Sequence, residues 1–299
     1  MTFDAMTQIS LPAPPASRPH RLIRSVLSNK AGVAGLAIVL SVAVIALAAE
    51  HLAPLDPLRR NLSLKLLPPA WLDGGDLRHL LGTDSQGRDL LSRIVFGART
   101  SLLVGIAAVA LSSLIGLVLG LIAGMAGGKI DALIMRLIDA MLAIPTMLFM
   151  LVVALVAGTG LLPLVVVIAA TNWVAAARIV RADVLGVKEM DYVAAARALG
   201  ARPAGLMLRH ILPNILSSFV VVSTMNVGTV ILAESALSFL GFGIQPPEIS
   251  WGQMLSEGRQ YLATSWWVAT FPGIAITLTV LGVILLGDWL RDHLDPRLD

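Results

Sequence analysis

A glycine-rich stretch is the first part of the chain whose residues could do chemistry. Residues 123–130 read AGMAGGKI, which approaches the phosphate-binding pattern GxxxxGK[ST]. That pattern needs a glycine where the chain has Ala123, and a hydroxyl that reaches magnesium where it has Ile130. We therefore expect no ATP-hydrolysing site in this chain and no cofactor bound to it.

Metal and nucleophilic chemistry also lack their residues. The chain has no cysteine, which excludes a disulfide, a thiolate metal site and a cysteine nucleophile. The histidines are too scattered for metal-ligand spacing; they are His20, His51, His79, His210 and His293. With no nucleophile paired to a base and no paired carboxylates, we expect no metal site and no catalytic residue.

One carboxylate stands out because of its apolar surroundings. Glu234 lies in the sequence VILAESALSFL. A carboxylate at membrane depth is costly and usually faces a cavity or a partner, so Glu234 is a candidate for a pathway or a gate. The glycines at 241–243 lie close in sequence, and they favour an interfacial position with a local hydrogen bond instead. Both interpretations stay open.

A basic segment at 191–214, DYVAAARALGARPAGLMLRHILPN, predicts a helix, a sharp turn and a second helix. Strong helix formers lead to Gly200, which can adopt the left-handed conformation that ends a helix. Pro203 suits the first turn of the next helix. This second helix, residues 203–210, is too short to be stable alone in water. Either the ends of the chain's own spans or the groove of a partner must hold it.

The elements that position these residues are long apolar helices. The chain is 57% hydrophobic and 14% charged, with a mean hydropathy of +0.83, which indicates an all-α integral membrane protein. Runs long enough to cross about 30 Å of hydrocarbon predict six transmembrane helices. They begin near Ala31, Ser101, Ala140, Leu161, Ile215 and Trp266. Pro145 predicts a kink in the third.

Charge and hydropathy predict the order of segments along the chain. We expect a partly disordered cytoplasmic tail at 1–30, a first span at 31–49, and an external segment at 50–100 with an amphipathic helix at 88–99. A core at 101–287 follows, with a cytoplasmic loop at 181–213, and then a cytoplasmic tail at 288–299. The basic loop after the fourth span supports this orientation, while the seven cations of 50–100 disagree with it. The net charge of +3 is therefore a matter of orientation, and we expect no nucleic-acid partner.

The loop at 191–213 resembles the EAA loop of ATP-binding-cassette importer permeases. In that pattern E-A-A is followed by three residues, a glycine, nine residues and I-x-L-P. The matching positions are Ala195, Ala196, Gly200, Leu212 and Pro213. Ala194 replaces the glutamate of the pattern, and His210 stands at the isoleucine position. The role of the turn therefore carries over, but a charged contact through the glutamate does not.

Three further segments resemble one branch of that family. They are GTDSQGRDLLSRIVFGARTSL at 82–102, SALSFLGFGIQPPEISWGQML at 235–255 and GDWLRDHLDPRL at 287–298. All three are similar to the C-type permeases of dipeptide, oligopeptide and nickel importers, although Trp289 stands where glycine is usual. The similarity extends in the right order from residue 82 to residue 298.

The resemblance implies a fold, an assembly and a cargo. It implies one N-terminal helix before a five-helix permease core in a bacterial inner membrane, surrounded by lipid. The partners would be a B-type permease, two ATPase subunits that use ATP and magnesium, and an extracytoplasmic substrate-binding protein. The cargo would be dipeptides or oligopeptides, with nickel or another small solute as the alternative. The residues expected to couple to the ATPase are Ala195, Ala196, Arg197, Gly200, Arg202, Arg209 and Pro213.

A hypothesis from another class is an ion-driven secondary transporter that works alone. Such proteins contain inverted repeats and broken helices with polar groups near the middle of the membrane. Residues 31–157 and 161–287 have no convincing repeat, and carboxylates within the apolar runs are few. A separate ATPase that copurifies with the chain would exclude this hypothesis.

Overall fold

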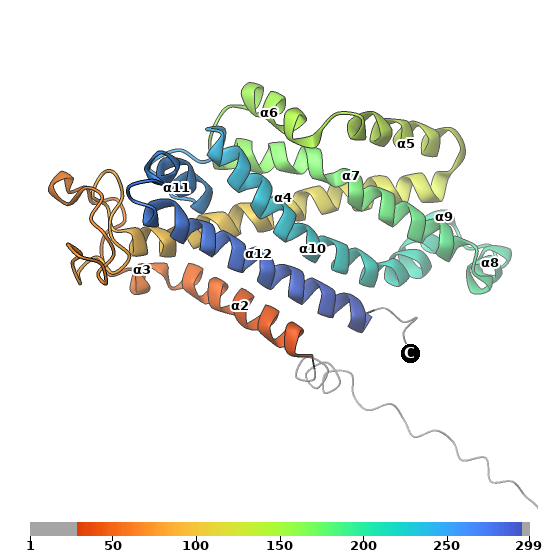
Figure 1. The fold of residues 1–299 in the computed structure, drawn as a ribbon. Coiled ribbons are helices and arrows are strands. Elements are labelled where there is room, and N and C mark those ends of the chain that lie inside the picture. Colours follow the sequence, from red (N-terminus) through yellow and green to blue (C-terminus); the bar gives the residue numbers. More distant parts are fainter. Residues whose placement is uncertain (1–28, 295–299) are drawn as a thin grey trace, which may run out of the picture.

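The chain folds into a bundle of long helices (Figure 1). The computed structural model describes residues 29–294. In that part, five helices are long and apolar enough to cross a membrane: α2 (Lys30–Leu47), α4 (Leu90–Ala126), α7 (Leu161–Lys188), the continuous helix Pro203–Phe239, and α12 (Trp267–Leu294). Helices suit this role because each satisfies its backbone hydrogen bonds internally, as the hydrocarbon requires.

In place of the third predicted span the chain has two short helices, which make a sixth span only if the bent pair is counted as one. They are α5 (Gly128–Leu142) and α6 (Thr146–Ala157), which meet at an angle of 92°. Pro145 lacks an N–H and disfavours helical backbone at the residue before it, so the expected kink becomes a break. The Arg181 side chain of α7 holds α5 in place, because its Nε and Nη2 donate to the two carboxylate oxygens of Asp131 at 2.5 and 2.7 Å.

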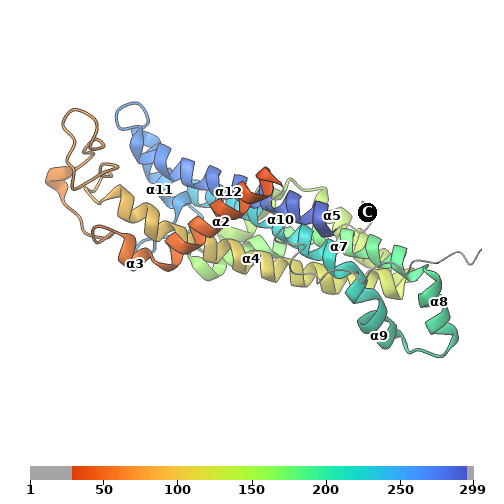
Figure 2. The ribbon, with the colours of Figure 1, turned by 90° about the horizontal axis from the view of Figure 1, so that it is seen from below.

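The remaining elements lie at the two ends of the bundle (Figure 2). Residues 53–89, here named the lobe, lie at one end with α3 (Ala49–Leu52) and α11 (Trp251–Gly258). We call this the lobe end. The other end, the loop end, carries α8 (Asp191–Ala198) and α9 (Pro203–Leu206). Short 3₁₀ turns occur at Leu62–Leu64 and Arg259–Tyr261.

One predicted helix has other bounds in the structure, and the two predicted tails are only partly described. The helix expected at 88–99 is not separate, because α4 begins at Leu90 and continues through the span to Ala126. Asp89 sets this start, since its carboxylate accepts a hydrogen bond from the backbone N–H of Ser92 at 2.8 Å. The first residues of the predicted C-terminal tail, 288–294, are helical and continue α12 to Leu294. Most of the predicted N-terminal tail, residues 1–28, lies outside the described residues.

Some of the seven cations of residues 50–100, which disagree with the charge rule, form ion pairs in the structure. Arg88 and Arg93 are buried and bind Asp84; Arg88 Nε lies 2.6 Å from its carboxylate. Burial raises the pKa of Asp84, and the guanidinium groups of Arg93 and Arg88 lower it by more, so the pKa lies below its ordinary value. Arg99 pairs with Glu50 at 3.0 Å. Three of the seven cations are therefore matched by nearby carboxylates.

Glycines set the distance between α4 and α7. Gly116, Gly120 and Gly124 are spaced every four residues along one face of α4. A Cβ atom on Gly116 would lie 2.6 Å from that of Ala176, and one on Gly120 would lie 2.6 Å from the carbonyl oxygen of Ala177. Lipid supplies no hydrophobic drive for helices to associate, so close packing through small residues is what joins them.

A glycine on a neighbouring helix also makes room for Trp289, the residue that stands where glycine is usual. Its ring packs over Gly32 of α2, where an added Cβ would lie 2.7 Å from the Trp289 Cγ atom. One turn further along, a Cβ on Gly35 would lie 2.6 Å from the backbone nitrogen of Leu286. A larger side chain in place of Gly32 would have no room, so Trp289 and Gly32 form a complementary pair between α12 and α2.

The packing of α4 against α7 predicts opposite effects of one substitution at two glycines. Gly120→Ala should lower the free energy of unfolding by about 1–3 kcal/mol, because the new methyl group overpacks the contact. Gly186→Ala in α7 should be neutral or stabilising by up to about 1 kcal/mol, because its Cβ meets nothing within 4 Å and alanine favours a helix. Unfolding in lipid nanodiscs measures both. Equal stability of the two variants would contradict the close contact.

Candidate functional site

The turn after α8 has the hydrogen bonds of a glycine-terminated helix. The N–H of Gly200 donates to the carbonyl of Arg197 at 3.0 Å, and the N–H of Ala201 donates to that of Ala196 at 3.1 Å. Gly200 has a φ of 85°, in the left-handed region. The predicted turn is confirmed, and glycine is required there by its backbone conformation.

The second helix of the segment is part of a span. From Pro203 the chain runs through α9, a π-helix (Met207–Ile211) and α10 (Leu212–Phe239) without a break. The wide π turn precedes Pro213, which cannot donate a backbone hydrogen bond. The Asn214 side chain instead donates to the carbonyl of His210 at 2.6 Å. The short helix is therefore stabilised by the span that continues it.

An apolar cluster fixes the segment on the ends of the chain's own spans. Val193 of α8, Leu206 of α9 and Ile211 are buried against Val184 of α7 and Leu121 of α4. Of the two ways in which the short helix could be held, the structure shows the first. A displacement of α8 would be transmitted directly to α4, α7 and α10 through these contacts.

The predicted coupling residues all lie at the loop end. Six of the seven are exposed, and Ala196 is half-buried against the apolar cluster. In the described part of the chain, no carboxylate pairs with Arg197, Arg202 or Arg209. The turn therefore presents three guanidinium groups to the outside of the protein.

Sequence reasoning missed Leu199, which occupies the tip of the turn. Its side chain is 89% exposed, although it belongs to none of the membrane-spanning helices. Single exposed apolar residues are common on protein surfaces, and Leu62 and Leu77 of the lobe are 74% and 81% exposed, so the position of Leu199 in the turn matters more than its exposure. The available signal was its position directly before Gly200, where the C-terminal cap of a helix points outward.

Glu234 lies far from this turn, about 30 Å along α10 at 1.5 Å per residue. Its carboxylate is fully buried and faces no open cavity. The hydroxyl of Ser238 donates to it at 2.8 Å and that of Ser235 at 3.3 Å. Both serines belong to α10, so these hydrogen bonds stabilise the buried carboxylate from within its own helix.

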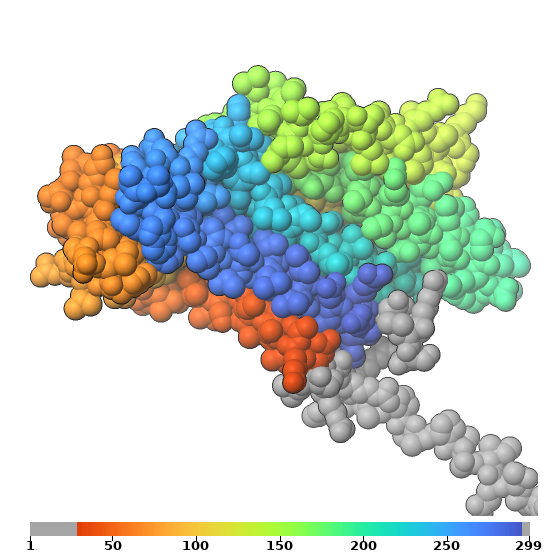
Figure 3. Space-filling model, in the orientation of Figure 1, coloured from red at the N-terminus to blue at the C-terminus, as the bar shows by residue number. Residues whose placement is uncertain are grey.

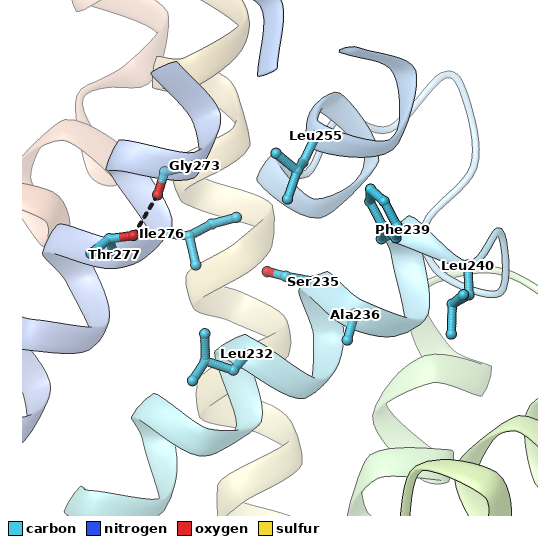
Figure 4. A pocket seen from close by; sticks show the side chains of 9 residues that line it. All are labelled: Leu232, Ser235, Ala236, Phe239, Leu240, Leu255, Gly273, Ile276 and Thr277. Atoms are coloured by element: carbon cyan, nitrogen blue, oxygen red, sulfur yellow. Dashed lines mark hydrogen bonds between the residues drawn. The ribbon is translucent and has the colours of Figure 1, made fainter. Parts of the chain in front are cut away.

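A hollow of about 480 Å³ lies beside this network (Figure 4). It is bounded by α10, α11 and α12, and α10 and α12 lie side by side on the face seen in Figure 3. Mostly apolar side chains line it, including Leu232, Phe239, Leu255 and Ile276. Of the Glu234 network, only Ser235 reaches the lining. The hollow is suited to apolar groups, and Glu234 is not among the residues that line it.

Comparisons with known proteins agree with this architecture. Residues 116–299 match the family of binding-protein-dependent transport system inner membrane components. Residues 20–69 match the N-terminal transmembrane domain of oligopeptide transport permease C. The first match covers most of the helical core, and the second covers α2 and part of the lobe.

Similar proteins cover nearly the full length. The di/tripeptide transport system permease protein DppC of Pseudomonas aeruginosa is 43% identical over 292 residues, which are 95% of this chain and 96% of that protein. The dipeptide transport system permease protein DppC of Escherichia coli is 46% identical over 270 residues, 90% of each chain. That of Bacillus subtilis is 39% identical over 290 residues, 97% of this chain and 89% of the other. The chain therefore belongs to the binding-protein-dependent transport family of inner-membrane permeases, in the branch of the C-type permeases.

Proposed function

We propose that this chain is the C-type permease subunit of an ATP-driven importer of dipeptides or oligopeptides. It forms half of the pathway and receives the energy of a separate ATPase through the loop at 181–213. The chain itself binds no cofactor or metal and carries no catalytic residue; ATP and magnesium are used by the partner subunits.

The observation that carries this proposal is the construction of the turn at Gly200. It exposes Leu199, with Arg197 and Arg202 beside it and Arg209 on the π-helix that follows, while its base packs on three of the chain's own long helices. A partner that binds the tip therefore acts on the spans through rigid contacts. This is what coupling to an ATPase requires of a permease.

Orientation follows from placing this turn in the cytoplasm, where ATP is. Both termini then lie in the cytoplasm and the lobe lies outside. Trp266 and Trp267, at the lobe end of α12, then sit at the outer membrane interface.

The proposed assembly contains a B-type permease, two ATPase subunits and an extracytoplasmic substrate-binding protein, within membrane lipid and without nucleic acid. Ala194, exposed on α8, leaves no carboxylate at the position of the motif glutamate. We assign the polar contacts with the ATPase to Arg197, Arg202 and Arg209, and the apolar contact to Leu199. Ala195, Ala196 and Pro213 shape the surface around them.

Glu234 takes a supporting role at the outer mouth. Because its carboxylate accepts hydrogen bonds from the hydroxyl groups of Ser235 and Ser238, it stabilises the end of α10 that packs against α11 beside the apolar hollow. We propose that it shapes the gate region without touching the cargo. The names of the relatives support peptides as that cargo, and nickel or another small solute is the alternative.

Substitution at Gly200 tests the coupling turn. Gly200→Val should lower transport per ATP hydrolysed by about tenfold. The left-handed backbone conformation costs a branched residue about 1.4 kcal/mol or more, so the variant should leave this conformation. An added Cβ at this position meets nothing within 4 Å, so crowding plays no part. Transport into proteoliposomes and ATP hydrolysis are measured together.

The matched control is Gly200→Asn, because asparagine tolerates left-handed backbone better than other residues. This variant should keep most of the coupling. Normal coupling by Gly200→Val would contradict the role of the turn, as would an equal loss in both variants.

The cargo is tested by ATP hydrolysis of the full complex in nanodiscs with its binding protein. We expect short peptides to stimulate hydrolysis, because the loaded binding protein signals through the lobe end. Chelated nickel is titrated separately. A response to nickel alone would move the cargo to another branch of the family, while no ATPase in the purified complex would contradict the importer itself.

A further inference from the structure

A buried cluster of four charges joins the lobe to α4 and α11. It consists of Asp84, Arg88 and Arg93, together with Glu257 of α11. Glu257 Oε2 accepts hydrogen bonds from Arg88 Nη2 at 2.7 Å and from Arg93 Nη1 at 2.9 Å. We call these four residues the lobe ion cluster. Two cations and two anions balance to zero net charge.

Burial makes this cluster costly to open. The side chains of Arg93, Asp84 and Arg88 are 1%, 2% and 4% exposed, and that of Glu257 is 24% exposed. If α11 moved away with Glu257, two guanidinium groups would remain buried against one carboxylate. An uncompensated buried charge is strongly destabilising, so the cluster resists separation of α11 from α4.

Other contacts of α11 act in the same direction. The indole N–H of Trp251 donates to the carbonyl of Ile94 at 2.9 Å, and its backbone N–H donates to the hydroxyl of Ser101 at 3.2 Å. The Ser256 hydroxyl donates to the carbonyl of Phe239 at the end of α10. These bonds join α11 to both α4 and α10.

The start of α12 belongs to the same unit. A Cβ on Gly258 would lie 2.8 Å from the backbone nitrogen of Ala269, so α11 and α12 are in close backbone contact. The Trp267 indole N–H donates to the carbonyl of Thr83 in the lobe at 3.3 Å.

We infer that Glu257 is a positioning residue that fixes α11 to α4, so that the lobe and the lobe ends of α4, α10, α11 and α12 move as one rigid unit. The cluster stays closed through the transport cycle. Opening of the pathway at this end then takes place at the borders of the unit, and α11 does not swing as a separate gate. The readout rests on the proposed transport function.

A covalent link in place of the ionic one tests this inference. Arg88→Cys with Glu257→Cys breaks the link, yet it keeps the charge balanced because Asp84 retains Arg93. The chain has no other cysteine, so a bis-maleimide of matched length joins only these two positions within it. Peptide uptake and basal ATP hydrolysis are measured in the full complex before and after linking.

We expect the unlinked double variant to lose about tenfold in uptake while basal hydrolysis is kept, and the linked form to return to within about twofold of the original chain. The control is Arg99→Ala with Glu50→Ala, which removes an exposed ion pair between α3 and α4. This control should transport normally, because an exposed pair contributes little.

Two results would overturn the inference. A linked form that remains inactive would mean that α11 must leave α4 during the cycle, and an unlinked form with normal uptake would mean that the connection is not needed. If the double variant does not assemble, Glu257→Gln is used, and normal uptake by that variant overturns the inference too. Absence of uptake by the unmodified complex would instead contradict the proposed function.

Discussion

The close contact between α4 and α7 is the interaction on which the rest of the structure depends. α4 begins directly after the lobe and α7 ends just before α8, so this pair joins the lobe end to the loop end. Helices in lipid gain little from hiding apolar surface, and the contact relies on glycines that allow the backbones to approach. Two helices packed this closely move together, because no layer of large side chains separates their backbones.

The two ends use charge in opposite ways. At the lobe end, arginines are buried and paired with carboxylates, which gives fixed geometry. At the loop end, Arg197, Arg202 and Arg209 are exposed, as is Leu199, which suits reversible contact with another protein. A permease that couples a moving ATPase to a pathway needs both kinds of surface, a rigid mouth and a surface that docks.

The sequence predicted the features that depend on local physics. The apolar runs, the turn at Gly200 and the interruption at Pro145 each follow from neighbouring residues. It could not predict the partner of Arg88 and Arg93, because Glu257 lies more than 160 residues further along the chain. Nor did the sequence reveal that most of residues 88–99 form the first turns of a membrane-spanning helix. The polar residues there suggested contact with water, but Arg88 and Arg93 instead bind Asp84. The role of Glu234 was left open because neighbouring residues do not reveal that α11 packs against this part of α10 and that the carboxylate is fully buried.

The most direct test of the account is the identity of the protein that contacts Leu199. A photo-activatable amino acid at this position, in the full complex in membranes, reports its neighbour on illumination. If the turn at Gly200 binds the ATPase, Leu199 should cross-link to an ATPase subunit. The same amino acid at Leu62, which is exposed in the lobe, should give no such cross-link. Cross-links from Leu199 to lipid or to the binding protein alone would contradict the assignment of this turn as the coupling surface.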